Sequence, residues 1–197
     1  MKTEKSEVKR DVDRREIFLK YLLLPTRGII FLSFYALLHF LYDWAPNVFF
    51  QAIAGINESV FEHMKIGFFA FLMFIGIDYL IHYLINGKKM ENKTSFTFSR
   101  LIGLILIGWL LMFIWYMIPA IHNQEASSLA IELSLSMIVT FISGMIAMTF
   151  ADNLEKFEFK LSFKIIIIAL VVILIIFYVV FSFITPWLDV FIDPEFL

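Results

Sequence analysis

Long, uninterrupted blocks of apolar residues alternate with short polar segments along this chain of 197 residues. Each block approaches the roughly 20 residues that a helix needs to cross a hydrocarbon core about 30 Å thick. Membrane β-barrel strands alternate in polarity, whereas these blocks are continuous, and a helix satisfies its own backbone hydrogen bonds. The pattern predicts an all-α polytopic membrane helix bundle with about five transmembrane helices, at residues 28–44, 66–86, 101–118, 128–150 and 164–185.

Three further segments complete this single membrane domain, 1–197. Residues 1–20 mix acidic and basic side chains without a signal-peptide cleavage site, which favours a solvated cytoplasmic helix. Residues 47–56 are apolar but too short to cross a bilayer, and we expect an interfacial or re-entrant segment there. Residues 186–197 follow the last span, and we expect them to form a tail on the outer interface, with Trp187 as an anchor.

The distribution of basic residues predicts how the bundle is oriented. With the N-terminus inside, all but one of the 16 Lys and Arg residues fall on the cytoplasmic side, as the positive-inside rule requires. Lys65 is the exception. We therefore expect a multi-pass protein of the cell membrane with a cytoplasmic N-terminus and an outer C-terminus.

Composition narrows the classes of partner and chemistry. The chain is 60% hydrophobic and 17% charged, with a net charge of -2, so the lipid bilayer is an expected partner and nucleic acid is not. The chain has no cysteine, which excludes disulfides, thiolate catalysis and cysteine-ligated zinc. The sequence also lacks a glycine-rich phosphate loop, a G-x-S-x-G elbow and an H-E-x-x-H motif.

The densest group of ionisable residues, INESVFEHMK, opens the second predicted span. Ser59 and Glu62 fit the S-x-x-E capping box, which satisfies free amides at the start of a helix. Asn57 and Glu58 also suit a helix N-terminus, where the macrodipole favours negative charge. A capping box needs only one acid and no histidine, so the second glutamate and His63 require another explanation.

A metal site is one such explanation. His39 and Asp43 are four residues apart at the outer end of the first span, so they share a helix face. Together with Glu62 and His63 they make a workable ligand set for zinc or a hard divalent metal. Whether a cofactor is bound stays open, with a divalent metal such as zinc as the candidate.

Other ionisable residues are predicted inside the bilayer. Asp78 lies about 18 Å below the start of its span and shares a face with His82. An ionisable group at that depth costs at least about 2.5 kcal/mol, so it marks either a functional site or a hydrogen bond across helices. The fourth span adds Glu132 near the outer surface, and Thr140 and Ser143 deeper in a stripe of small and polar residues that also suits helix packing.

These residues predict an outer polar layer of His39, Asp43, Glu58, Glu62, His63 and Glu132, and an inner layer of Asp78, His82, Thr140 and Ser143. Both layers require the first, second and fourth spans to adjoin. The expected ligand-binding or functional cluster consists of Asn57, Glu58, Ser59, Glu62, His63, Asp78, His82 and Glu132.

Three stretches, HFLYDW at 39–44, NESVFEHMK at 57–65 and FIDPE near the C-terminus, support a family resemblance. The chain resembles a family of small prokaryotic multi-pass membrane proteins of unknown function that carry an N-E-S-x-(W/F)-E-H-x-K motif. The resemblance implies that the polar residues of this motif act as a unit. Separately, Ser59, His63 and Asp78 are similar to the serine, histidine and aspartate of seven-span zinc hydrolases, including the alkaline ceramidases, although this chain has fewer spans.

Three functions remain open at this point. The first is a binding or transport module for a cation, a proton or a small polar solute at an outward-facing site of His, Glu and Asp side chains. The second is a metal-dependent intramembrane hydrolase acting on lipid-like substrates, with zinc held by His39, His63 and an acid. The third is a non-catalytic membrane scaffold whose polar residues only cap and pack helices.

Overall fold

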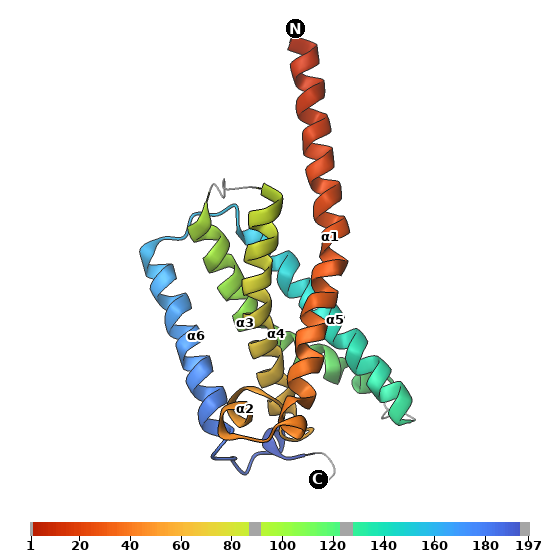
Figure 1. The fold of residues 1–197 in the computed structure, drawn as a ribbon, viewed down its shortest axis with the longest axis vertical. Helices are drawn as coiled ribbons and strands as arrows, with labels where there is room; N and C mark the ends of the chain where they lie inside the picture. Colours follow the sequence, from red (N-terminus) through yellow and green to blue (C-terminus); the bar gives the residue numbers. More distant parts are fainter. Residues whose placement is uncertain (1, 87–91, 123–127, 194–197) are drawn as a thin grey trace.

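The computed structural model describes residues 2–86, 92–122 and 128–193, and this part of the chain is helical, with no strand. The predicted all-α fold class is therefore confirmed. The elements in chain order are α1 Lys2–Trp44, α2 Val48–Ile53, α3 Val60–Asn86, α4 Lys93–His122, α5 Leu129–Leu154, α6 Leu161–Phe181 and the short 3₁₀ helix η1 Asp189–Phe191 (Figure 1).

Five of these helices are long and apolar enough to cross a membrane, as the sequence predicted. α1 runs without a break through Pro25 and rises out of the bundle, so the charged N-terminal segment and the first span form one helix (Figure 1). The observed spans differ from the predicted ones by one or two turns at their ends. They are Leu23–Trp44, Val60–Leu84, Lys93–Ile118, Ala130–Leu154 and Leu161–Phe181.

Four helices surround a common interior in the cyclic order α1, α3, α4 and α5. α1 and α4 each pack against both α3 and α5, and α6 packs on the outside of α4. α3 and α5 consequently face each other across the bundle instead of sharing a main interface. The prediction that the first, second and fourth spans adjoin is confirmed for α1 with each partner but wrong for α3 with α5.

Aromatic side chains fill the interior. Phe31 on α1 and Phe71 and Phe74 on α3 are fully buried, and the rings of Phe31 and Phe71 meet edge to face with centroids 5.7 Å apart. On α5, Gly144 lies directly against the ring of Phe31. The small-residue stripe of α5 therefore serves helix packing, because it lets α5 approach the bulky rings of α1.

One end of the bundle is covered by α2 and the C-terminal segment. α1 ends here, α3 begins here and α6 ends here (Figure 1). Asn47 caps α2 by accepting a hydrogen bond from the backbone N–H of Phe50 at 2.9 Å. Gln51 on α2 donates to the backbone carbonyl of Ser182, just after α6, at 3.0 Å. The short apolar segment at 47–56 thus contains the helix α2, which packs against the end of α6 and the start of α3.

Candidate functional site

The loop between α2 and α3 holds the residues of the INESVFEH stretch in a variant of the predicted capping box. The Ser59 hydroxyl accepts from the backbone N–H of Glu62 at 3.4 Å. Glu62 does not return to Ser59 but accepts from the backbone N–H of Ile56 at 3.1 Å. Asn57 takes the N–H of Ser59 instead, at 2.9 Å. Asn57 thus has the role that the glutamate has in a standard capping box, and Glu62 holds the backbone at Ile56 instead.

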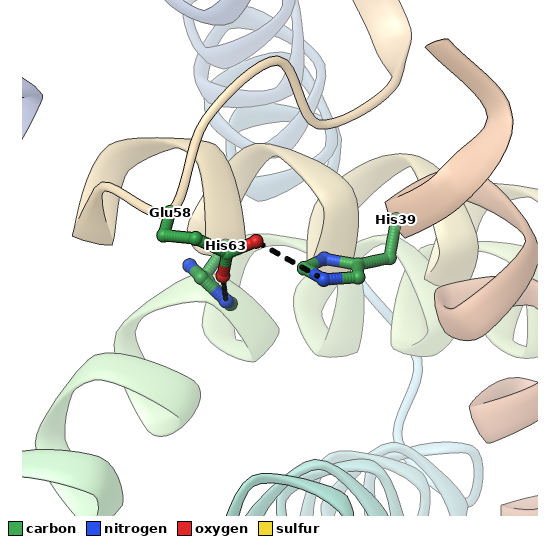
Figure 2. A group of neighbouring side chains, drawn as sticks. All are labelled: His39, Glu58 and His63. Carbon is green, nitrogen blue, oxygen red and sulfur yellow. Dashed lines mark ion pairs between the residues drawn. The ribbon is translucent and has the colours of Figure 1, made fainter. Parts of the chain in front are cut away.

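Three ligand-type side chains meet beside this loop, and we call them the histidine cluster: His39 on α1, Glu58 in the loop and His63 on α3 (Figure 2). The Glu58 carboxylate lies between the two imidazoles. One of its oxygens is 3.4 Å from Nε2 of His39, and the other is 3.4 Å from Nε2 of His63. Because one ligand atom from each residue lies within 4.8 Å of the others, the three could bind a single ion.

A backbone hydrogen bond fixes the tautomer of His63. Its Nδ1 lies 2.9 Å from the carbonyl oxygen of Ser59, which only accepts, so Nδ1 carries the proton. In the neutral imidazole Nε2 then bears a lone pair, and Nε2 is the atom that faces the Glu58 carboxylate. Two acceptors at this separation repel each other unless a proton or a metal cation lies between them. A second-shell hydrogen bond of this kind is typical of metal-ligating histidines.

The distances in the histidine cluster are too long for direct hydrogen bonds. Nitrogen–oxygen hydrogen bonds span about 2.7–3.2 Å, and both contacts of Glu58 are longer. The two contacts are made to different oxygens of Glu58, and one ligand atom from each of the three residues lies within 4.8 Å of the others.

His39 differs from His63 in its second ring nitrogen. Its Nδ1 is buried and has no hydrogen-bond partner among the residues that the structure describes. The ring is held by aromatic contacts instead. It lies parallel to Tyr35 with centroids 6.4 Å apart, and it meets the edge of Phe40 at 4.8 Å.

Two residues that the sequence placed among the candidate ligands lie outside this cluster. Asp43 is exposed one turn beyond His39. Glu62 is buried and pairs with the ammonium group of Lys65 at 2.6 Å. Lys65 is itself fully buried and donates to the carbonyl oxygen of Gln51 and to the hydroxyl of Ser182. The second glutamate of the motif therefore forms a structural ion pair, and the first one faces the histidines.

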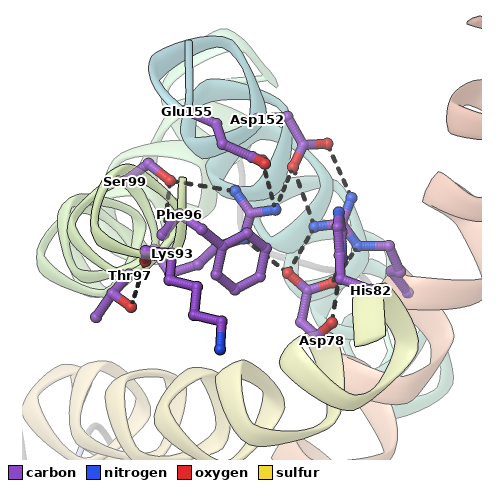
Figure 3. A network of polar contacts seen from close by, with 10 residues as sticks. Asp78, His82, Lys93, Phe96, Thr97, Ser99, Asp152 and Glu155 are labelled. Carbon is purple, nitrogen blue, oxygen red and sulfur yellow. Dashed lines mark hydrogen bonds and ion pairs between the residues drawn. The ribbon is translucent and has the colours of Figure 1, made fainter. Parts of the chain in front are cut away.

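A second charged cluster, which we call the charge ring, lies at the other end of the bundle. Each helix of the four-helix arrangement contributes one residue: Arg27 from α1, Asp78 from α3, Arg100 from α4 and Asp152 from α5 (Figure 3). All four are buried. Arg27 and His39 are twelve residues apart on α1, so about 18 Å separates the two clusters along that helix.

Positive and negative charges alternate around the ring. Arg27 contacts Asp78 and Asp152, each at 2.8 Å. Arg100 contacts the same two carboxylates at 2.7 and 2.8 Å. Glu155, at the rim of the ring, adds a contact to Arg100 at 3.3 Å. Two guanidinium groups and two carboxylates balance one another, so the ring offers no free charge to a solute.

The remaining candidates of the sequence analysis fall in different places. His82 lies beside the charge ring, with Nδ1 3.1 Å from the carbonyl oxygen of Asp78. Thr140 and Ser143 are buried on α5 but take no part in the ring. Glu132 is exposed at the start of α5, and its side chain makes no hydrogen bond or ion pair with any described residue. The predicted inner layer is therefore not one cluster.

Arg27, Arg100 and Asp152 were not among the predicted site residues, because the positive-inside rule places both arginines on the cytoplasmic side and no motif marks the aspartate. Their common signal is position: each lies within a turn or two of the end of a predicted span. An arginine there is read as a topology signal unless its partner on another helix is known.

Comparison with known proteins identifies the family. Residues 13–195 match a family described as a family of unknown function (DUF6512). The chain belongs to this family. No curated protein and no solved structure matches the chain. Membership in DUF6512 assigns no activity, so a function has to be argued from the geometry of the site.

In this DUF6512 member, three stretches that are far apart in the sequence meet at the histidine cluster. HFLYDW supplies His39, and NESVFEHMK supplies Glu58 and His63. FIDPE supplies Asp193, whose carboxylate accepts from the backbone N–H of Glu58 at 3.1 Å. The fold thus brings together in space three stretches that the sequence identifies only one by one.

Proposed function

We propose that this chain is a membrane protein that binds a divalent transition metal ion at the histidine cluster. The observation that carries this proposal is the pair of imidazole nitrogens facing one carboxylate, His39 and His63 against Glu58, at 3.4 Å each. Imidazole and carboxylate ligands suit zinc and its first-row neighbours. We place the site on the outer face of the cell membrane, with the N-terminus cytoplasmic, because of the distribution of Lys and Arg.

The site is of the open type. The described residues bring three ligands together, and the Glu58 side chain is 61% exposed, so solvent reaches the cluster. A fourth position is then free for water or for an exchangeable ligand, as in catalytic zinc sites. A zinc-dependent hydrolase acting on lipid-like substrates is for this reason the second candidate function.

A transport function has less support than metal binding. Asp78 is the acidic residue predicted deepest in the bilayer, where a path for a cation or a proton would need an ionisable group. Its carboxylate contacts both Arg27 and Arg100, and it would have to leave both to receive a cation. Buried Phe31, Phe71 and Phe74 fill the bundle interior between the two clusters.

Metal binding is tested with the full chain purified in detergent, by Co²⁺ absorption spectroscopy and by elemental analysis after Zn²⁺ loading. We expect one metal ion per chain, and a loss of affinity of about tenfold or more in His63→Ala, because a ligand is removed. His82→Ala is the matched control: its side chain is 23% exposed, against 31% for His63, but it lies at the charge ring. We expect it to bind as tightly as wild type.

A wild-type protein that takes up no metal would contradict the proposal, as would an equal loss in both histidine variants. Hydrolysis of lipid esters by the zinc-loaded protein, abolished in His63→Ala, would support the second candidate.

A further inference from the structure

We propose that Asp193 is a positioning residue for the histidine cluster: it sets metal affinity by holding the backbone of the Glu58 loop and not as a ligand. The inference rests on the proposed function. It also makes a prediction about the metal-free protein, so the two can fail separately.

Glu58 differs from the other two ligands in how it is held. His39 and His63 stand on long helices, whereas Glu58 lies in the loop between α2 and α3. Its side chain is 61% exposed. The position of its carboxylate therefore depends on where the loop backbone is held. Second-shell groups that orient a ligand in this way commonly set the affinity of a metal site.

Side-chain oxygens hold three backbone N–H groups of this loop. The N–H of Ile56 donates to Glu62, and the N–H of Ser59 donates to Asn57. In each pair the two residues lie close together in the sequence. The N–H of Glu58 is held by Asp193, which is 135 residues away. The hydrogen bond from the backbone of Glu58, the proposed metal ligand, is thus the one whose acceptor lies outside the loop.

The segment that carries Asp193 is anchored independently of the loop. Phe191, two residues earlier, is buried against the ring of Phe61 with centroids 4.6 Å apart, and against Phe181 at 5.3 Å. Phe61 is in the first turn of α3, two residues before His63. The helix that supplies one ligand therefore also anchors the segment that positions another, and this fixes the geometry between them.

The experiment measures Co²⁺ and Zn²⁺ affinity of the full chain for Asp193→Ala, Asp193→Asn and Asp189→Ala. We expect Asp193→Ala to bind about 10–100-fold more weakly, because the Glu58 loop loses its distant hydrogen bond. Asp193→Asn keeps an oxygen acceptor and should stay within about threefold of wild type. Asp189→Ala removes the same charge from an exposed position of the same segment and should bind like wild type.

A second readout needs no metal. In the metal-free protein, hydrogen–deuterium exchange of peptides covering residues 54–60 should rise in Asp193→Ala and stay unchanged in the other two variants. Wild-type metal affinity in Asp193→Ala, or an equal loss in Asp189→Ala, would overturn the inference while the metal site stands. Unchanged exchange in Asp193→Ala would overturn it even if the wild-type protein bound no metal.

Discussion

At the residue scale, the two charged clusters differ in how their groups are satisfied. In the charge ring each arginine contacts both aspartates, so two positive and two negative groups neutralise one another out of reach of water. In the histidine cluster two imidazoles face one carboxylate, and no Lys or Arg side chain among the described contacts lies between them. The first arrangement is complete, and the second one fits an added ion.

The completeness of the ring can be measured by removing one charge. Asp78→Asn leaves two buried guanidinium groups with one carboxylate, which costs about 3–5 kcal/mol in comparable buried pairs. Glu155→Gln removes a charge from the same Arg100, but its side chain is 36% exposed, so we expect a loss of about 1 kcal/mol or less. The measurement is the free energy of unfolding in mixed detergent micelles. Equal losses in the two variants would show that the ring is not a closed unit.

At the element scale, helix packing depends on where glycine meets an aromatic ring. Apolar length alone predicts the spans, and each predicted span coincides with an observed helix apart from its ends. Apolar length does not predict which faces meet. The contact of Gly144 with Phe31 brings α5 onto α1, whereas Gly76 on α3 has open space where a side chain would lie.

These two glycines make a matched pair for a packing test. A Cβ at position 144 would overlap the buried ring of Phe31, so Gly144→Ala should lower the free energy of unfolding by about 1–3 kcal/mol. Gly76→Ala meets no atom within 4 Å and should leave stability unchanged or slightly higher. Thermal unfolding of both variants in detergent gives the comparison. An unchanged free energy of unfolding in Gly144→Ala would contradict this prediction. It would mean that α1 and α5 can move apart at little cost.

At the scale of the whole molecule, the fold places the histidine cluster and the charge ring at opposite ends of one bundle. The cluster lies at the end that α2 and the C-terminal segment cover, and the ring lies about two turns inside the end of α3 and the start of α4. The two ends of the bundle therefore differ in their chemistry. The Lys and Arg distribution predicts that the end with the cluster faces outward.

The absence of cysteine makes this orientation directly testable. Val48 on α2 is 72% exposed, and Glu158 is exposed between α5 and α6. In intact cells, a membrane-impermeant maleimide should label Val48→Cys, and it should label Glu158→Cys only after lysis. The reverse pattern would place the histidine cluster on the cytoplasmic side and would contradict the outward-facing site.

The sequence by itself determined the class of protein, the positions of the spans and the stretches with chemical interest. It could do so because crossing a bilayer imposes a length and a polarity that are local in the chain. It also placed His39, Glu58 and His63 in one outer polar layer, since depth follows from counting residues along a helix.

Only the tertiary structure decided which of those groups meet. Glu58 and Glu62 are four residues apart in one motif, yet the first faces two histidines and the second pairs with Lys65. Asp78 was predicted in an inner layer with His82, Thr140 and Ser143, and the arginines that neutralise it come from two other helices. The physical reason is that depth is a property of one helix, whereas a charge partner depends on how helices are arranged around one another.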